Sequence, residues 1–327
     1  MPPAIIDAAT AFKDGLLQRE AAQMAEAARR WLVVERTLQD SIDALAYELA
    51  NTGTPTMGML SRSARYQALR RQIAAELDKY AQYMDGRIAD GQRNAVTMAV
   101  EYSAASVNAV AIESQAAVNF NRLLVSATEN LIGMAGNGSP LIDVLNDATQ
   151  GAADRMAERL IAGLALGKNP LEVARQAIRL GLGSSFTRMQ TIARTEMLRA
   201  AREATLQSYR ASNVVVAYRR LSARDRRTCA ACLFADGNIY PLGESFDQHP
   251  NCRCVALPIL RGIPPVTYET GREWFTRQPE TTQLAILGRG RFDLWRRGEA
   301  SLNDMVSRDW SDTWGGSLRV TRVRDLG

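Results

Sequence analysis

The sequence is poor in histidine, cysteine and lysine, and these shortages exclude several kinds of chemistry. Its 327 residues contain one histidine and four cysteines, and only three of the 40 basic residues are lysine. A single histidine excludes metal sites of the HExxH type and any catalysis that needs two imidazoles. We attribute most of the excess of arginine to a codon bias toward GC-rich DNA, because nothing in the sequence requires arginine everywhere.

Long hydrophobic runs and a strong excess of one charge are also missing. No stretch of 18 apolar residues occurs, and residues 1–7 lack the basic and apolar regions of a secretory signal. The net charge is +5 and 46% of the residues are hydrophobic, which does not fit a polybasic arm or a disordered chain. We therefore expect a soluble, cytosolic chain of about two domains with no membrane partner.

The first part of the chain has helical periodicity. Apolar residues recur at three- and four-residue spacings over 14–50, and a second run extends from about 59 to 131, with interruptions expected near Gly86 and Gly91. The threonine-, glycine- and proline-rich stretch 51–56 predicts a turn between the two runs. These lengths predict an extended helical bundle or stalk over residues 1–132.

Residues 133–212 are predicted to be the helical part of a second domain. Residues 133–140 read as a glycine-rich linker, and Gly181 and Gly183 are expected to end a helix that Pro170 begins. The helices that we expect here cover residues 141–166, 170–180 and 186–210.

The character of the sequence changes at Asn213. The β-branched run 214–218 and the apolar run 255–260 predict two strands that could pair and bracket all the cysteines. Pro258 should lie at a sheet edge or a strand end, because proline cannot donate to the hydrogen-bond ladder. We assign residues 213–262 to this small β-containing module.

Residues 263–327 are predicted to form a tail of short helices, and the whole chain is therefore mainly α with a small β module (α+β). Ser301 and Asp304 resemble a helix capping box. The tail holds four of the five tryptophans, which predicts a small satellite core, with a surface for partner proteins as the alternative. The helices that we expect here cover residues 273–275, 281–287, 291–297 and 301–308.

All four cysteines and the only histidine fall in one short window. Cys229-x2-Cys232 is followed, after sixteen residues, by His249-x2-Cys252-x-Cys254. Two short turns that each supply soft ligands match the tetrahedral coordination of zinc, which prefers cysteine and histidine. Five candidates compete for four positions. Either His249 and three cysteines bind the metal, or the four cysteines bind it and His249 lies outside.

Disulfides, redox catalysis and a metallohydrolase are the alternatives to a structural zinc site. Stable disulfides are uncommon in a reducing cytosol, and no βαβ unit accompanies the CxxC pair. A hydrolase needs an open metal position and a general base, whereas four protein ligands close the site. We therefore predict a structural Zn²⁺ and no enzymatic activity. Removing the metal should unfold roughly residues 213 to 262 while the helical part survives.

Taken in order, the motifs resemble a known family. They are similar to the motifs of the phage Mu F-like minor head proteins, also called phage head morphogenesis proteins. The motifs are, in order, Ile192-Ala-Arg194-Thr195-Glu196, then Asp225, Thr228 and the Cys229-x2-Cys232 pair, then Asp236-Gly237 and His249-Pro-Asn-Cys252-Arg-Cys254. The resemblance covers about residues 166–260, and more weakly 270–288. It implies that the five Cys and His residues form the metal motif and that Arg194, Thr195 and Glu196 form a helical signature.

The resemblance implies a structural protein of a tailed phage or prophage. Such a protein would be present in few copies per virion and would associate with the portal protein during procapsid assembly, with major capsid or scaffolding proteins and phage DNA as further partners. It would lie in the capsid interior near the portal, after a stage in the host cytoplasm. Arg194 and Glu196 are two residues apart on a helix and do not face each other. We expect one to be solvated and the other bonded to a nearby loop, with a buried clasp to the zinc loop as the alternative.

A zinc module that binds nucleic acid is the second functional hypothesis. Residues 219–327 hold 17 arginines against 13 acidic residues, so the basic charge is biased toward this half. Phosphate contacts from this module would be sensitive to salt. The acidic residues are interleaved with the basic ones, which equally fits an ordinary solvated surface. The arginines that could contact phosphates are Arg219, Arg220, Arg224, Arg226 and Arg227.

Overall fold

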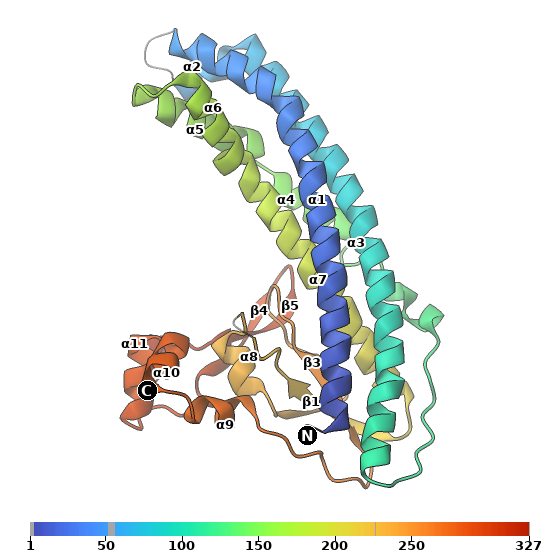
Figure 1. The fold of residues 1–327 in the computed structure, drawn as a ribbon. Coiled ribbons are helices and arrows are strands. Elements are labelled where there is room, and N and C mark those ends of the chain that lie inside the picture. Colours follow the sequence, from blue (N-terminus) through green and yellow to red (C-terminus); the bar gives the residue numbers. More distant parts are fainter. Residues whose placement is uncertain (1–2, 52–55, 226, 327) are drawn as a thin grey trace. The chain divides into compact units, whose positions relative to one another are not determined.

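The computed structural model describes residues 3–51, 56–225 and 227–326, and the chain divides into two compact units. Three long helices, α1 (Ala4–Ala50), α3 (Ala64–Glu113) and α7 (Gly183–Ala211), contribute residues to both units. The fold is mainly helical with small sheets, as the sequence predicts (Figure 1). Unit 1 comprises Met1–Arg19, Asp90–Gly138 and Thr195–Gly327, and unit 2 comprises Glu20–Ala89 and Ser139–Arg194.

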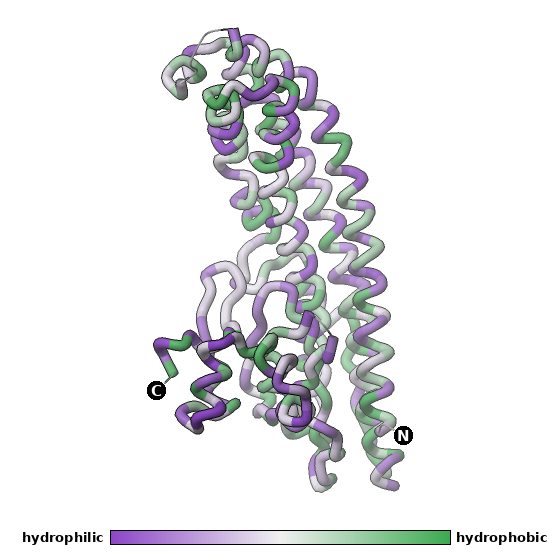
Figure 2. The backbone as a smooth tube through the Cα atoms, turned by 60° about the vertical axis from the view of Figure 1, so that its left-hand side comes forward, coloured by the Kyte–Doolittle hydropathy of each residue, from purple (hydrophilic) through white to green (hydrophobic). Residues whose placement is uncertain are grey.

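Unit 2 is built from helices around an aromatic centre. Trp31 stacks on Phe186 at a ring distance of 5.1 Å and meets the edge of Tyr80, whose hydroxyl donates to the carbonyl of Ala27. Hydrophobic and hydrophilic residues alternate along the long helices, as amphipathic helices require (Figure 2). The shorter helices of this unit are α2 (Met57–Arg62), α4 (Leu141–Thr149), α5 (Ala152–Ala165) and α6 (Pro170–Ala177).

The predicted interruption of the second helical run is wrong. Helix α3 continues through Gly86 and Gly91 and ends at Glu113, well before residue 131, and a short 3-10 helix, η1 (Val125–Leu131), follows an irregular segment. The helix predicted over 141–166 is instead divided at Gly151, whose φ of 66° suits glycine. Residues 52–55 of the turn predicted at 51–56 lie outside the described residues.

The helix end predicted at Gly181 and Gly183 is also wrong. Helix α6 continues directly through a π-helical turn, η2 (Ile178–Leu182), into α7. A Cβ on Gly181 would lie 2.6 Å from the Cα of Met156 in α5. This glycine therefore allows two helices to approach closely and does not terminate one.

Unit 1 contains a three-stranded antiparallel sheet in the order β2-β1-β3. The two predicted strands pair, with Tyr218 opposite Pro258, so Pro258 lies on an edge strand as expected. Phe12 of α1 stacks on Tyr102 of α3 at 4.2 Å, and the Tyr102 hydroxyl donates to the carbonyl of Ala256 in the sheet. The strands are β1 (Val215–Leu221), β2 (Ile239–Pro241) and β3 (Val255–Leu260).

The tail begins with the expected helices but ends in a hairpin. The helix predicted over 301–308 is wrong, because β4 (Val306–Ser311) and β5 (Gly315–Val320) pair in an antiparallel sheet. Ser301 and Asp304 do form the capping bonds, but they close a turn. Gly315 takes a φ of 71°, which favours a chain reversal there. The other tail elements are α9 (Gly271–Thr276), α10 (Glu280–Leu287), α11 (Arg289–Arg296) and η3 (Val323–Asp325).

The tryptophans of the tail differ in burial, and only part of the predicted satellite core contains them. Trp295 packs against Phe275 and Phe292 in a satellite core, as predicted. Trp310 on β4 is 73% exposed and contributes nothing to that core.

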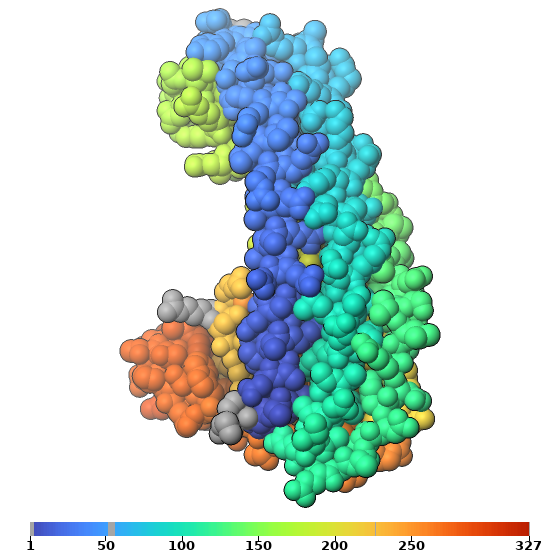
Figure 3. Space-filling model, turned by 45° about the vertical axis from the view of Figure 1, so that its right-hand side comes forward, coloured from blue at the N-terminus to red at the C-terminus, as the bar shows by residue number. Residues whose placement is uncertain are grey.

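Within the described residues, one helix, α3, is long and apolar enough to cross a membrane on length and composition alone. More than half of its most apolar window (56%) is buried, and core helices of soluble proteins pass the same test, so this is weak evidence for a membrane span. Figure 3 shows α3 packed alongside α1.

Candidate metal centre

The cysteine window of unit 1 is built from two tight turns. Cys229 caps helix α8 (Ala230–Ala235), and its Sγ accepts the backbone N–H of Cys232 at 3.3 Å. In the second turn the N–H of Cys252 donates to the carbonyl of His249 at 3.0 Å. Asn251 in that turn has a φ of 62°, a left-handed conformation that asparagine adopts more readily than most residues.

The two turns bring all five predicted residues together. His249 Nε2 lies 3.2 Å from the Sγ of Cys229 and 3.1 Å from that of Cys232. Cys232 Sγ lies 3.8 Å from Cys252 Sγ. The ligand atoms form two groups, Cys229 with Cys232 and His249, and Cys232 with Cys252 and Cys254, each within 4.8 Å. Ligands around a tetrahedral zinc ion lie about 3.5 to 3.8 Å apart, so these groups could hold a metal ion.

The hydrogen bond of His249 fixes which ring nitrogen faces the thiols. Its Nδ1 lies 2.8 Å from the carbonyl oxygen of Pro250, which can only accept, so Nδ1 carries a proton. Nε2 is then the nitrogen directed at the sulfur atoms, where it offers a lone pair in the neutral ring and a proton in the charged ring. A second hydrogen bond of this kind is typical of histidines that bind metals.

The electrostatics of the cluster favour the thiolate at Cys229 and Cys252 but not at the other two cysteines: hydrogen bonds with neighbouring thiols raise the pKa of Cys232 well above its usual value, and the pKa of Cys254 is raised to about 12. Burial by itself would lower the pKa of His249, but its hydrogen bond with Cys229 and the nearby thiolate charges raise that pKa to about 9. A hydrogen bond with Cys232 lowers the pKa of the Cys229 thiol to about 4, against the effect of burial. Bonds with neighbouring thiols and the charges of two arginines hold the pKa of Cys252 well below its usual value. Thiolates are the form that binds metal ions.

The two arginines lie buried beside the thiols. Arg220 is 1% exposed, and its Nη2 lies 3.5 Å from the Sγ of both Cys232 and Cys252. Arg202 donates to the carbonyl of Cys252 at 2.8 Å. Within the described residues neither guanidinium pairs with a carboxylate, and a buried cation without a counter-charge is unfavourable. The Cys252 thiolate, whose pKa both arginines lower, supplies negative charge beside them.

The helical signature contacts the site through Thr195. Its Oγ1 accepts the N–H of Asn251 at 3.0 Å, which anchors the turn containing His249 and Cys252 to α7. The only feature of the sequence that points to this contact is a hydroxyl residue within the helical motif. That feature does not show that the partner is Asn251.

Glu196 is bonded to a nearby loop, but not to the cysteine window. Its fully buried carboxylate accepts from Arg199 at 2.6 Å and from the N–H of Gly136 in the 133–140 linker at 3.1 Å. The alternative of a clasp between Glu196 and the zinc loop is therefore wrong. Arg194 forms an ion pair with Glu20 at 2.5 Å.

The motif aspartates hold the loops around the site. Asp225 pairs with Arg253 at 2.5 Å, which ties the loop before Cys229 to the segment between Cys252 and Cys254. Asp236 is completely buried and accepts from Arg224 at 2.6 Å and from the N–H of Ser222.

The arginines expected to contact phosphates are mostly used inside the module. Arg219 donates to the carbonyls of Gly237 and Val266, Arg220 faces the thiols, and Arg224 pairs with Asp236. Arg227 is exposed, and Arg226 lies outside the described residues. Three of the four described arginines thus stabilise the fold, which leaves a small surface for phosphate binding.

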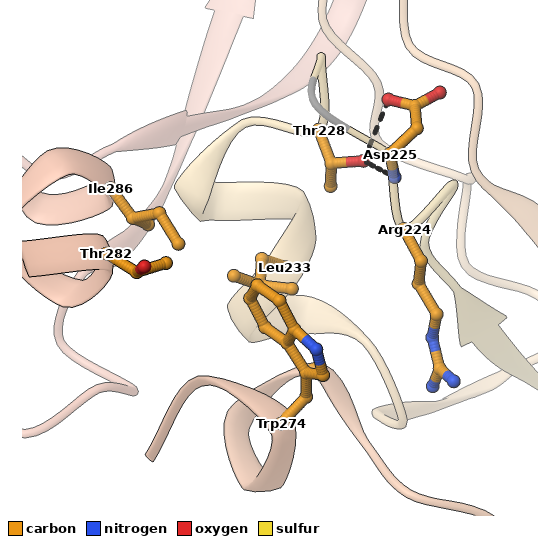
Figure 4. Close-up of a pocket in the computed structure, with 8 residues that line it drawn as sticks. Arg224, Asp225, Thr228, Leu233, Trp274, Thr282 and Ile286 are labelled. Carbon is orange, nitrogen blue, oxygen red and sulfur yellow. Dashed lines mark hydrogen bonds between the residues drawn. The ribbon is translucent and has the colours of Figure 1, made fainter. Parts of the chain in front are cut away.

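A cavity of about 530 Å³ opens beside α8 (Figure 4). Leu233, Trp274 and Ile286 give it an apolar wall, and the Thr228 hydroxyl accepts the N–H of Asp225 at its rim. No cysteine or histidine lines it, so the cavity is separate from the cluster.

These features define a mainly helical protein whose small sheet domain carries a Cys/His cluster that could hold a metal ion. Residues 154–257 match the family model described as Phage Mu protein F like protein. This match confirms the resemblance over that part of the chain and indicates a phage head morphogenesis protein. The match runs from α5 into β3 and includes every candidate ligand. No curated protein and no solved structure matches the chain.

Proposed function

We propose that this chain is a minor head protein of a tailed phage or prophage that binds the portal protein during procapsid assembly. The family match over residues 154–257 carries the proposal, because head morphogenesis requires contacts with other phage structural proteins. In this proposal the protein enters the virion in few copies and lies in the capsid interior near the portal. Capsid or scaffolding proteins and packaged DNA are its further contacts, and assembly takes place in the host cytoplasm.

The Cys/His cluster holds a structural zinc ion in this proposal. The support is the donor set itself, since zinc prefers thiolate and imidazole ligands in a tetrahedral arrangement. The ion supplies a rigid cross-link between the Cys229 turn and the His249 turn. Four protein ligands leave no position for an activated water, which supports a structural role without enzymatic activity.

Co-purification with the portal protein encoded beside this gene tests the proposal, with zinc measured by elemental analysis on the same sample. We expect a stable complex with about one zinc per chain. Cys232→Ser is the matched variant, because Cys232 belongs to both ligand groups. It should lose the zinc. A folded, zinc-loaded chain that does not bind the portal protein would contradict the head-assembly role.

Contact with DNA needs a separate measurement. If phosphate contacts are made, binding to duplex DNA should weaken steeply between low and moderate salt. Arg227→Ala should weaken it further, since Arg227 is exposed, whereas Arg224, which is also exposed, is paired with Asp236. If the protein does not bind duplex DNA, or if salt does not change its binding, DNA is not a partner of this protein.

A further inference from the structure

We propose that this chain associates with a second copy of itself by inserting Trp310 of one copy into the cavity beside α8 of the other. The two parts of the contact, an exposed tryptophan and an open apolar cavity, both lie in unit 1. The inference goes beyond the proposed role in head assembly and does not depend on portal binding.

Trp310 is exposed on a fixed support. Its side chain is 73% exposed, and within the described residues no other aromatic ring packs against it. The residue lies on β4 opposite Gly316 of β5. Two residues further on, the carbonyl of Asp312 accepts a hydrogen bond from Asn137 at 2.8 Å. A large indole that a hairpin holds in water is the type of side chain that anchors contacts between proteins.

The cavity has the size and the lining to receive an indole. A cavity of about 150 Å³ accommodates benzene, so a volume of about 530 Å³ is ample for the larger indole. Leu233 and Ile286 supply apolar contacts, and Trp274 offers a ring for aromatic packing (Figure 4). Thr282 lies in the same wall, where its hydroxyl can accept the indole N–H.

The walls of the cavity are fixed before a partner binds. A Cβ on Gly271 would overlap the carbonyl oxygen of Leu233, so α9 lies directly against α8. Thr270 and Glu273 form a capping box that begins α9. Because these walls need no reordering, little conformational entropy is lost when the indole enters.

The charges of the two segments are complementary. Residues 224–228, three of which line the cavity, contain three arginines and one aspartate. Residues 309–314, which surround Trp310, contain two aspartates and no basic residue. One aspartate in each segment already has an arginine partner. Within the described residues no carboxylate pairs with the exposed Arg227 and no cation pairs with Asp312, so each segment keeps a charge that the other can neutralise.

A second copy is the occupant, because Trp310 is held away from the cavity of its own chain. It is not one of the residues that line that cavity. Its strand is held by the pairing with β5 and by the packing of Val306 and Leu318 on α8. Every copy carries both the tryptophan and the cavity, so two copies supply the complete contact.

Sedimentation equilibrium of the full-length protein, free of DNA, tests the contact. Self-association should increase with concentration, and Trp310→Ala should weaken it at least about 30-fold, as expected for a side chain that anchors an interface. Ile112→Ala is the matched control, because Ile112 is 78% exposed on α3 and belongs to neither segment. A wild type that is monomeric at every concentration would overturn the proposal. Association that both variants reduce equally, or that Trp310→Ala leaves unchanged, would also overturn it.

A mixture of two variants tests whether the tryptophan and the cavity meet. Thr282→Trp fills the cavity and keeps Trp310, whereas Trp310→Ala keeps the cavity open. Each variant alone should be monomeric, and the mixture should form 1:1 pairs. Ile286→Glu replaces Thr282→Trp if circular dichroism shows that the latter does not fold. A cavity variant that still self-associates, or a mixture that remains monomeric, would overturn the proposal.

A charge exchange tests the orientation of the two copies. Asp312→Arg and Arg227→Glu should each weaken the association, since each places like charges opposite one another, and the double variant should recover it. Without recovery, the proposed approach of the two segments is wrong. The portal protein enters none of these experiments, so their failure is distinguishable from a failure of the head-assembly role.

Discussion

Single hydrogen bonds hold the turn that carries two of the proposed ligands. Thr195→Val should leave the Asn251 N–H without its partner and cost about 1 to 3 kcal/mol in the free energy of unfolding. Thr195→Ser keeps the hydroxyl and is the control. Hydrogen exchange at the Asn251 amide should accelerate in the valine variant alone. Equal exchange in the two variants would show that this bond does not hold the turn.

The buried carboxyl of Glu196 makes a pH-dependent contribution to stability. Burial raises the pKa of Glu196 above its usual value of 4.5, although Arg199 and the N–H of Gly136 lower it in part. The folded state therefore binds this proton more tightly than the unfolded chain does. The resulting stability is fully present below pH 4.5 and is lost as the pH rises through the folded pKa.

Glu196→Gln reproduces the neutral carboxyl at every pH and isolates this effect. Relative to the variant, the wild type should gain stability as the pH falls from 7 toward about 5. Urea unfolding of both proteins at each pH measures the difference, and any loss of metal affects both alike. A difference that stays constant over this range would contradict the direction of the shift.

At the scale of elements, two glycines with the same sequence environment have different roles. Gly181→Ala should destabilise the protein by about 1 to 3 kcal/mol, because the new methyl group meets the backbone of Met156. Gly183→Ala meets nothing within 4 Å in a helical segment and should stabilise it by about 0.5 to 1 kcal/mol. Denaturant midpoints measure both. Equal effects would show that the contact between the helices is not as close as described.

The hairpin of the tail shows how a local signal can be misread. Ser301 and Asp304 make the hydrogen bonds of a capping box, yet the chain continues into β4. The strand is stabilised by its pairing with β5, where Ser311 lies opposite Gly315. That pairing depends on the chain reversal next to Gly315, whose φ is 71°.

At the scale of the whole molecule, the metal should stabilise all of unit 1 and not only residues 213–262, the module that contains the metal. Cys232, Cys252 and Cys254 share one hydrophobic core with Phe12 of α1 and Tyr102 of α3. We therefore expect a chelator to destabilise unit 1 as a whole, whereas unit 2 keeps its own centre around Trp31. This prediction is broader than the loss of residues 213–262 expected from the sequence.

Hydrogen exchange with mass spectrometry, with and without chelator, measures the extent of this change. Faster exchange in the unit 1 parts of α1 and α3 would support the shared core. Faster exchange restricted to 213–262 would support the narrower prediction. An equal increase in exchange in both units would contradict both predictions.

The sequence by itself determined the features that depend on neighbouring residues. The helical periodicity of residues 14–50, the strand at 255–260 and the grouping of five Cys and His residues all follow from short-range patterns. The family resemblance rests on the same local motifs, and the match over residues 154–257 confirms it. The division into four domains and the zinc ion stay predictions.

Only the tertiary structure decided which distant residues meet. Thr195 and Asn251 are 56 positions apart, and Arg220 reaches Cys252 across 32. Gly181 differs from Gly183 in what packs against it. Spacing along the chain carries no information on such contacts, because they arise when separately formed helices and strands bury their apolar faces against one another.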